Sequence, residues 1–337
     1  MSPRLLIYGA TGYTGALVSR EAIRRGLVPI VAGRNTDKVT ALASALEVEG
    51  RTFDLTEPEE IARGLTDVSV VLNVAGPFSV TAPPLLAGAI RAGVHYLDTT
   101  AELGTFLLTE AANGSARRAG VMVMSGTGWD VVPSDALAAR TAARVQDPVS
   151  LRLALKIFVG AAGDDIPLLF SRGSTTSALG FAEHAGSSRN DGVLTKDGGS
   201  AARSFDFGQG PERATLAPMG DLVTAFTSTG IPNIEVFVAG EVPLPTLPAG
   251  TDLPDGPSES DRAIGRARVA AEVTGRDGTI ARGLVDTPTG YGFTIQSSVE
   301  IAARVLSGDF APGFHSPASA YGPSILTSIA DSHFIDL

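Results

Sequence analysis

The sequence predicts an α/β fold whose first part is a doubly wound parallel sheet of the Rossmann type. An apolar stretch at residues 5–8 runs directly into a turn with glycines at positions 9, 12 and 15. Strand and helix patterns then alternate with short connections up to about residue 145, as a parallel sheet requires. With 337 residues, the chain is long enough for two domains.

The glycine turn is the first candidate binding site. It stands where a first strand passes into a helix over residues 14–26, so its backbone amides and the helix dipole can hold a pyrophosphate. Gly9 permits the tight turn, Gly12 lets the backbone approach phosphate, and Gly15 allows close packing of helix on strand. A plain glycine turn is the alternative. The residues expected to bind cofactor here are Gly9, Thr11, Gly12, Tyr13, Thr14 and Gly15.

The end of the second expected strand, Val28–Ala32, indicates which dinucleotide is bound. An NAD-preferring site carries Asp or Glu about 20 residues after the turn, whereas this chain has Arg34 and Asn35, with Lys38 following. The guanidinium fork of Arg34 suits a 2′-phosphate, which a carboxylate would repel. We therefore predict NADP(H), with a solvated loop arginine as the alternative.

The following elements place further loops at the same edge. Helices are expected over residues 36–46 and 81–92, and two more are expected to begin at 57–59 and at about 102. Strands are expected over residues 51–55, 68–74, 94–100 and 121–125. Because ligands bind at the carboxyl ends of such strands, loops 9–15, 33–38, 73–78 and 98–102 should face the cofactor. This adds five residues to the predicted cofactor site: Asp54, Asn73, Ala75, Gly76 and Pro77. For Asp54, an ordinary acid at the end of a strand is the alternative.

Past residue 126 the pattern changes. A loop leads into a helix for which Ser134 is a plausible N-cap, and residues 149–159 and 233–240 have strand character. The proline-rich stretch 243–257 predicts a loop or linker. Residues 267–284 predict a hairpin turning at 276–278, followed by a helix over 292–306.

Composition excludes several classes of function. The net charge of −10 argues against nucleic-acid binding, and the lack of cysteine excludes thiolate chemistry and cysteine-ligated metals. No apolar run is long enough to span a bilayer, and a cytoplasmic location is the default expectation. The spacing of the four histidines is not that of metal ligands. No lysine stands four residues after a tyrosine, which excludes the Tyr-x-x-x-Lys pair of many reductases.

A proton donor must then come from the loops above the nicotinamide. The catalytic candidates are Tyr96, Asp98, Trp129 and Asp130, with Glu102 also considered. For each acid a helix cap or turn is the alternative role. Trp129, the single tryptophan, would line the pocket or belong to the core.

Seven motifs resemble, in order, those of the saccharopine dehydrogenase-like family, particularly its trans-acting enoyl reductase branch. They lie at residues 9–15, 32–34, 73–78, 96–102, 128–135, 171–178 and 228–233. The resemblance implies an NADP(H)-binding Rossmann domain (residues 1–130), a second α+β domain (131–285) and a C-terminal segment (286–337) whose helix returns to the first domain. It implies no particular catalytic residue, although Arg172 is a candidate for holding a carboxylate.

The resemblance also bears on the substrate. Longer relatives carry an apolar helical region where this chain has the proline-rich 243–257, which disfavours a lipid tail and favours a small or carrier-bound substrate. The leading hypothesis is an NADPH-dependent reductase of a conjugated C=C or C=N bond. An opine-type or saccharopine-type amino-acid dehydrogenase and a non-catalytic NADP(H) sensor remain alternatives. A homodimer stays open.

Overall fold

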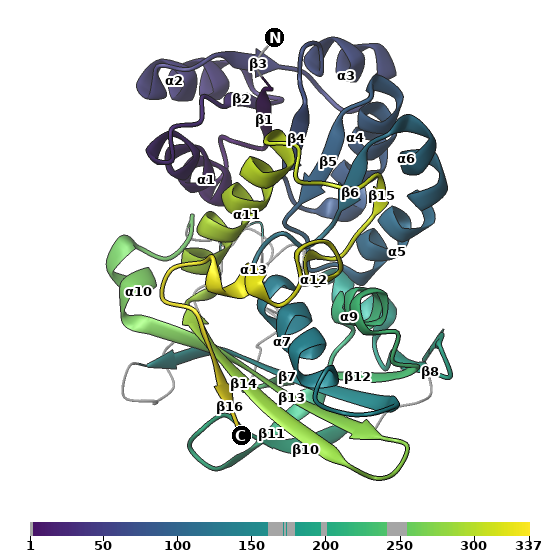
Figure 1. Cartoon of the computed structure of the whole chain (residues 1–337). Coiled ribbons are helices and arrows are strands. Elements are labelled where there is room, and N and C mark those ends of the chain that lie inside the picture. The colour runs from purple at the N-terminus through teal and green to yellow at the C-terminus, as the bar shows by residue number, and fades with distance from the viewer. Residues whose placement is uncertain (1–2, 161–170, 172, 174–178, 197–200, 241–254) are drawn as a thin grey trace.

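A computed structural model of the chain describes residues 3–160, 171, 173, 179–196, 201–240 and 255–337. It contains a seven-stranded sheet and a nine-stranded sheet, with helices packed around the first and between the two (Figure 1). The predicted linker 243–257 falls largely outside the described residues, as does Arg172.

The first sheet is parallel throughout and has the order β15-β6-β5-β4-β1-β2-β3. Its strands are β1 (Leu5–Tyr8), β2 (Ile30–Gly33), β3 (Gly50–Thr52), β4 (Val70–Asn73), β5 (His95–Asp98), β6 (Met122–Met124) and β15 (Gly313–Phe314). The helices that connect them are α1 (Tyr13–Arg24), α2 (Thr36–Leu46), α3 (Pro58–Gly64), α4 (Phe78–Ala92), α5 (Leu103–Ala111) and α6 (Asn113–Ala119). The predicted doubly wound sheet is confirmed.

Two local predictions need correction. The third strand ends at Thr52 and does not reach 55, because the Asp54 carboxylate accepts from the amides of Leu55 and Thr56 and turns the chain there. Ser134 does not cap a helix. The helix α7 (Val132–Ala142) already begins two residues earlier, and the Ser134 hydroxyl donates to the Val131 carbonyl within its first turn.

The second sheet is mixed, with the path β10-β11-β12-β7-β13-β14-β16 and with β8 and β9 beside β12. Its strands are β7 (Pro148–Gly160), β8 (Ser188–Asn190), β9 (Val193–Thr195), β10 (Ala202–Asp206), β11 (Pro211–Leu216), β12 (Asn233–Ala239), β13 (Gly265–Gly275), β14 (Ile280–Pro288) and β16 (His333–Asp336). The predicted hairpin is the β13–β14 pair. One face of this sheet packs against α7, whose Leu137 side chain lies close to Gly283 of β14.

The C-terminal segment contacts both sheets. Helix α11 (Gly290–Leu306) packs on α1, β4 and β5 and so returns to the first domain, as the resemblance implied (Figure 1). Strand β15 then pairs with β6, whereas the last strand, β16, pairs with β14 of the second sheet. The remaining short helices are η1 (Leu179–His184), α9 (Asp221–Thr229), α10 (Glu259–Ile264), α12 (Pro317–Tyr321) and α13 (Ser324–Thr327).

Candidate active site

The carboxyl ends of β1, β2, β4 and β5 lie at one edge of the first sheet. Tyr8 is in register with Ala32 on one side and Asn73 on the other, and Asn73 is in register with Asp98. The loops that follow these strands therefore leave the sheet side by side. This is the edge at which parallel α/β sheets bind their ligands.

The three glycines of the first turn differ in what the surrounding chain demands of them. Gly9 has φ +87°, and a Cβ there would lie 2.7 Å from the Cβ of Ala75. A Cβ at Gly15 would lie 2.2 Å from the Gly9 carbonyl oxygen. At Gly12, by contrast, the nearest atom would be 3.4 Å away and the residue is exposed. The fold thus requires glycine at 9 and 15, while the exposed backbone at Gly12 is accessible to a phosphate.

Other side chains of the turn contact neighbouring segments. A Cβ at Gly33 would lie 3.7 Å from the Thr11 hydroxyl oxygen, so Thr11 lies beside the end of β2. The Tyr13 hydroxyl donates to the Pro257 carbonyl and accepts from Arg262 Nη1 at 2.7 Å. Its ring meets that of Tyr291 edge to face, with centroids 5.3 Å apart. Thr14 follows in the first turn of α1 and is partly exposed.

At the end of β2, Arg34, Asn35 and Lys38 are all exposed. The Asn35 carboxamide oxygen accepts from the Lys38 amide at 2.9 Å and caps α2. Tyr8 lies beneath this loop. Burial and, to a smaller extent, the negative charge of Asp54 raise the pKa of Tyr8 to about 12, and the positive charge of Arg34 opposes the rise. Arg34 and Asp54 therefore both lie within electrostatic reach of Tyr8.

The loop after β4 is held by two polar side chains. Asn73 is fully buried; its amide donates to Thr81 and Tyr96, each at 3.2 Å, and its oxygen accepts from the Ala75 amide at 3.1 Å. The Glu102 carboxylate accepts from the amides of Phe78 and Ser79, at 2.9 and 2.7 Å, and so caps α4. Ala75 and Pro77 are partly exposed and Gly76 is exposed above the carboxyl edge.

Tyr96 and Asp98 of β5 are buried within the sheet edge. The Asp98 carboxylate accepts from the amides of Thr100 and Gly126 and from the Ser125 hydroxyl, at 2.8–3.1 Å. Burial raises its pKa to about 6, and these hydrogen bonds oppose the rise. Burial also raises the pKa of Tyr96 well above its ordinary value. Asp98 thus joins the ends of β5 and β6.

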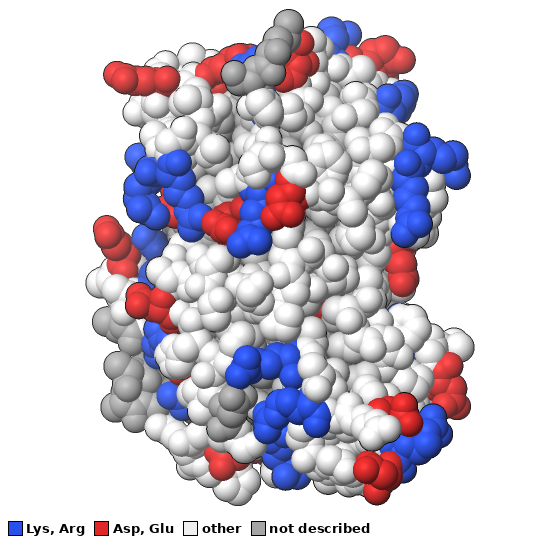
Figure 2. Space-filling view, in the orientation of Figure 1, with Lys and Arg blue, Asp and Glu red and all other residues white. Residues whose placement is uncertain are grey.

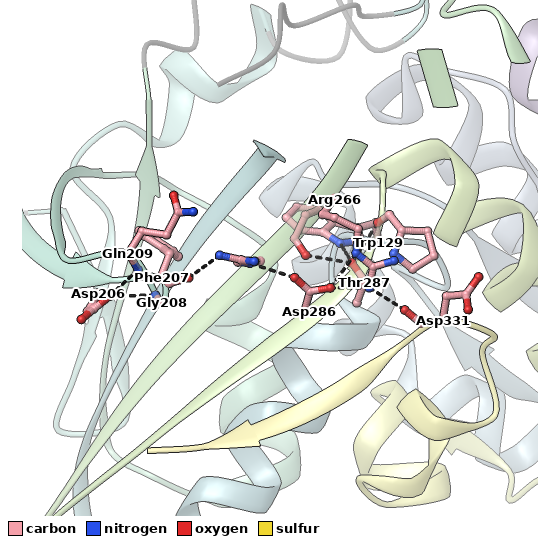
Figure 3. Close-up of polar contacts among 12 residues, drawn as sticks. Trp129, Asp206, Phe207, Gly208, Gln209, Arg266, Asp286, Thr287 and Asp331 are labelled. Atoms are coloured by element: carbon pink, nitrogen blue, oxygen red, sulfur yellow. Dashed lines mark hydrogen bonds and ion pairs between the residues drawn. The ribbon is translucent and has the colours of Figure 1, made fainter. Parts of the chain in front are cut away.

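Trp129 belongs to the contact between the two sheets. It is 2% exposed, and its indole Nε1 donates to the Thr287 hydroxyl at 2.9 Å. Figure 3 shows Trp129 and Thr287 beside Asp286, which forms ion pairs with Arg266 and with Arg268. The backbone amide of Trp129 donates to the Thr294 hydroxyl of α11.

Asp130 differs from the other catalytic candidates. The residue is partly exposed, yet one carboxylate oxygen, Oδ1, is buried and has no hydrogen-bond partner among the described residues. Burial raises the pKa of Asp130 to about 6. Asp130 is therefore a carboxyl group poised near neutral pH, close to the carboxyl edge of the sheet.

Sequence reasoning missed Asp221, the first residue of α9. It is fully buried, and burial, together with the negative charges of Asp130 and Asp135, raises its pKa to about 7, while a hydrogen bond from the Ser134 hydroxyl opposes the rise. An acid that follows a glycine at the start of a helix is usually exposed to solvent, so the local sequence does not predict that Asp221 is buried.

In the described ranges, no group of His, Asp and Glu side chains could hold a metal ion. Nor does any described helix have both the length and the apolar character needed to cross a membrane. Figure 2 shows Lys and Arg on one face in small, separate groups, often beside Asp or Glu.

Comparison with known proteins agrees with this geometry. Residues 5–124 match the family model of the saccharopine dehydrogenase NADP binding domain. A probable mitochondrial saccharopine dehydrogenase-like oxidoreductase of Arabidopsis thaliana is 30% identical over 152 residues, and a putative trans-acting enoyl reductase of Mycobacterium tuberculosis is 30% identical over 140 residues. Each match covers 39% of this chain and 33% of the relative's length.

The similarity of fold extends over the whole chain. Apo saccharopine dehydrogenase (L-Glu forming) of Saccharomyces cerevisiae superposes with a TM-score of 0.68, covering 99% of this chain and 100% of that one at 14% identity. The sequence match and the glycine turn both lie in the first domain. Over residues 5–124 the chain is similar to the saccharopine dehydrogenase NADP binding domain.

Proposed function

We propose that the protein is an NADP(H)-dependent oxidoreductase that reduces a conjugated C=C or a C=N bond of a small or carrier-bound metabolite. The observation that supports this proposal most is the glycine turn at the carboxyl edge of a parallel sheet, with Gly12 exposed and Arg34 exposed at the neighbouring strand end. The family of the first domain supports the same cofactor.

The chain's own residues have distinct tasks in this proposal. The amides of the turn and the first turn of α1 bind the pyrophosphate, and Arg34 binds the 2′-phosphate. NADPH, when bound, supplies the hydride. Reduction of a C=N or C=C bond also requires one proton. Among the predicted catalytic residues, Asp130 is best suited to donate it, because it alone combines partial exposure with a buried, unpartnered oxygen among the described residues.

The other candidates have structural partners that favour a different role. Asp98 accepts three hydrogen bonds, Tyr96 is fully buried, and Trp129 is fixed at the inter-sheet contact. We assign them to positioning the loops that carry the cofactor and Asp130. A carrier-bound substrate, a homodimer and a cytoplasmic location stay predictions.

The test has two stages. NADPH and NADH are titrated by fluorescence, and we expect clear preference for NADPH; equal or negligible binding of both would contradict the cofactor assignment. NADPH consumption is then measured with enoyl thioesters, cyclic imines and 2-oxo acids paired with amines. Asp130→Asn should lower turnover at least about 100-fold while leaving the NADPH dissociation constant unchanged. Tight NADPH binding with no turnover of any acceptor would favour the sensor alternative.

A further inference from the structure

One segment of the second domain lies directly against the glycine turn. A Cβ at Gly256 would lie 2.7 Å from the Tyr13 ring, and the Tyr13 hydroxyl donates to the carbonyl of the buried Pro257. Tyr13 is the first residue of α1 and follows the exposed Gly12. Residues 256–262, which include the start of α10, therefore lie beside the turn that is expected to bind a pyrophosphate.

Arg262 of this segment is held at both its backbone and its side chain. Its carbonyl accepts from the Thr289 hydroxyl at 3.1 Å, and Thr289 is the buried residue that precedes α11. Its guanidinium donates through Nη1 to the Tyr13 hydroxyl at 2.7 Å and to the Pro257 carbonyl at 2.8 Å. These bonds fix the guanidinium against the first residue of α1.

No carboxylate neutralises this guanidinium in the described part of the chain. Arg262 is partly exposed and has no ion pair there, and its side-chain hydrogen bonds all come from Nη1, which leaves Nε and Nη2 as available donors. The neighbouring acid, Asp261, accepts from the Ser258 hydroxyl and amide. These bonds lower the pKa of Asp261, and the charge of Arg262 makes the smallest contribution to that change.

The start of α1 is positive as well. Its N-cap, Gly12, has no side chain that could accept from the first amides, and the first turn contains no acid. A guanidinium beside the positive end of a helix dipole is unfavourable unless an anion binds to both. Because the turn belongs to the stretch that is similar to an NADP binding domain, the pyrophosphate of the cofactor is the anion that fits this place.

We propose that Arg262 is a further cofactor-binding residue, whose guanidinium binds the pyrophosphate of NADP(H) from the second domain. Tyr13 is its positioning residue, because the Tyr13 hydroxyl holds Nη1 of Arg262. This inference rests on the cofactor part of the proposed function and does not depend on which bond is reduced. Since NADPH and NADH share the pyrophosphate, Arg262 should strengthen the binding of both, whereas Arg34 should discriminate between them.

The dissociation constants of NADPH and NADH are measured by fluorescence titration with no acceptor present. We expect Arg262→Gln to weaken the binding of both about 10-fold or more at an unchanged ratio, and to make NADPH binding less sensitive to salt. Arg262→Lys keeps the charge without the fork and should recover part of the affinity. Tyr13→Phe keeps the ring without the hydroxyl and should weaken both cofactors about threefold or more. Arg276→Gln, at the exposed turn between β13 and β14, is the matched control and should change neither constant.

A purely structural role of Arg262 would give a different result. In that case Arg262→Gln would lower the melting temperature of the cofactor-free protein but leave both dissociation constants and their salt dependence as in the parent, which would overturn the inference. A changed ratio of NADPH to NADH affinity would also overturn it, because Arg262 would then act on the 2′-phosphate.

Two further outcomes separate this inference from the proposed function. If Arg262→Gln does not fold, parent-like affinities in both Arg262→Lys and Tyr13→Phe would overturn the inference. A parent protein that binds both cofactors through Arg262 and reduces no acceptor would retain the role of Arg262 and reject the proposed reaction. A parent that binds neither cofactor would contradict both.

Discussion

The indole nitrogen of Trp129 lies 2.9 Å from the hydroxyl oxygen of Thr287 and donates a hydrogen bond to it across the boundary between the two sheets. Trp129 follows β6 of the first sheet, and Thr287 lies near the end of β14 of the second. The Thr287 hydroxyl in turn donates within its own sheet, to carbonyls at Ala267 or Pro288. The bond therefore fixes how the loop that carries Asp130 meets the second sheet.

Replacing Trp129 should reduce stability and leave cofactor binding intact. Trp129→Phe removes the N–H donor and part of a buried ring, at a cost of about 2 kcal/mol in the free energy of unfolding. Urea denaturation followed by circular dichroism measures this cost, and calorimetry should give an NADPH dissociation constant within about twofold of the parent. Thr287→Val removes the acceptor, so the double variant should cost less than the sum of the two. Lost NADPH binding at unchanged stability would instead place Trp129 in the pocket wall.

Gly12 and Gly15 should respond differently to alanine. In Gly15→Ala the new Cβ meets the Gly9 carbonyl at 2.2 Å, so we expect a melting temperature lower by several degrees and at least about tenfold weaker NADPH binding. Gly12→Ala meets only ordinary contact and should melt near the parent temperature, yet bind NADPH about tenfold more weakly. Gly114→Ala on α6 is the control for both measurements. Normal NADPH affinity in Gly12→Ala would remove the phosphate from this turn.

The sequence predicted those features of the fold that depend on local backbone conformation. Gly9 has the positive φ and Gly15 the close helix–strand approach that their spacing indicated, and the parallel strands follow from the alternation of strand and helix patterns. Ser134 shows the limit of such reasoning. A serine before an apolar run is a good N-cap, but α7 begins two residues earlier, and the Ser134 hydroxyl donates to the Val131 carbonyl within the first turn.

Long-range burial could not be predicted in this way. Asp221 is 91 positions from Asp130 along the chain, and its burial depends on tertiary packing, such as that of α9 on α7 and of Gly220 on Phe106. Glu102 likewise gives no sign in the sequence that it caps the helix before its own, at Phe78 and Ser79. Such partners are set by tertiary contacts, which residue spacing does not encode.

Arg34 should decide the preference between NADPH and NADH. Arg34→Glu replaces a phosphate-binding guanidinium with a carboxylate, so NADPH binding should weaken about 10- to 100-fold while NADH binding stays level or improves. Fluorescence titration of each cofactor measures both constants. Arg63→Glu makes the same change of charge on exposed α3 and should leave the NADPH to NADH ratio as it was. A ratio unchanged in Arg34→Glu would mean that the 2′-phosphate lies elsewhere.

The pH dependence of stability should reveal the buried acid at α9. Burial raises the pKa of Asp221 to about 7, above the roughly 3.9 of an unfolded aspartate, so between these values the folded state binds more protons than the unfolded state. Its contribution to stability is therefore largest below pH 4 and is lost as the pH rises towards 7. Relative to the parent, Asp221→Asn should gain on the order of 2 kcal/mol in free energy of unfolding between pH 4.5 and 8.

A control of opposite sign accompanies this measurement. Backbone amides of Gly208 and Gly210 lower the pKa of the exposed Asp206, so its contribution is present at neutral pH and is lost as the pH falls through the lowered value. Urea denaturation at pH 4.5, 6 and 8 should show Asp221→Asn gaining on the parent as the pH rises, whereas the difference between Asp206→Asn and the parent should stay nearly constant, because Asp206 is ionised at all three values. If Asp221→Asn ran parallel to the parent at all three values, Asp221 would not be held protonated by its burial.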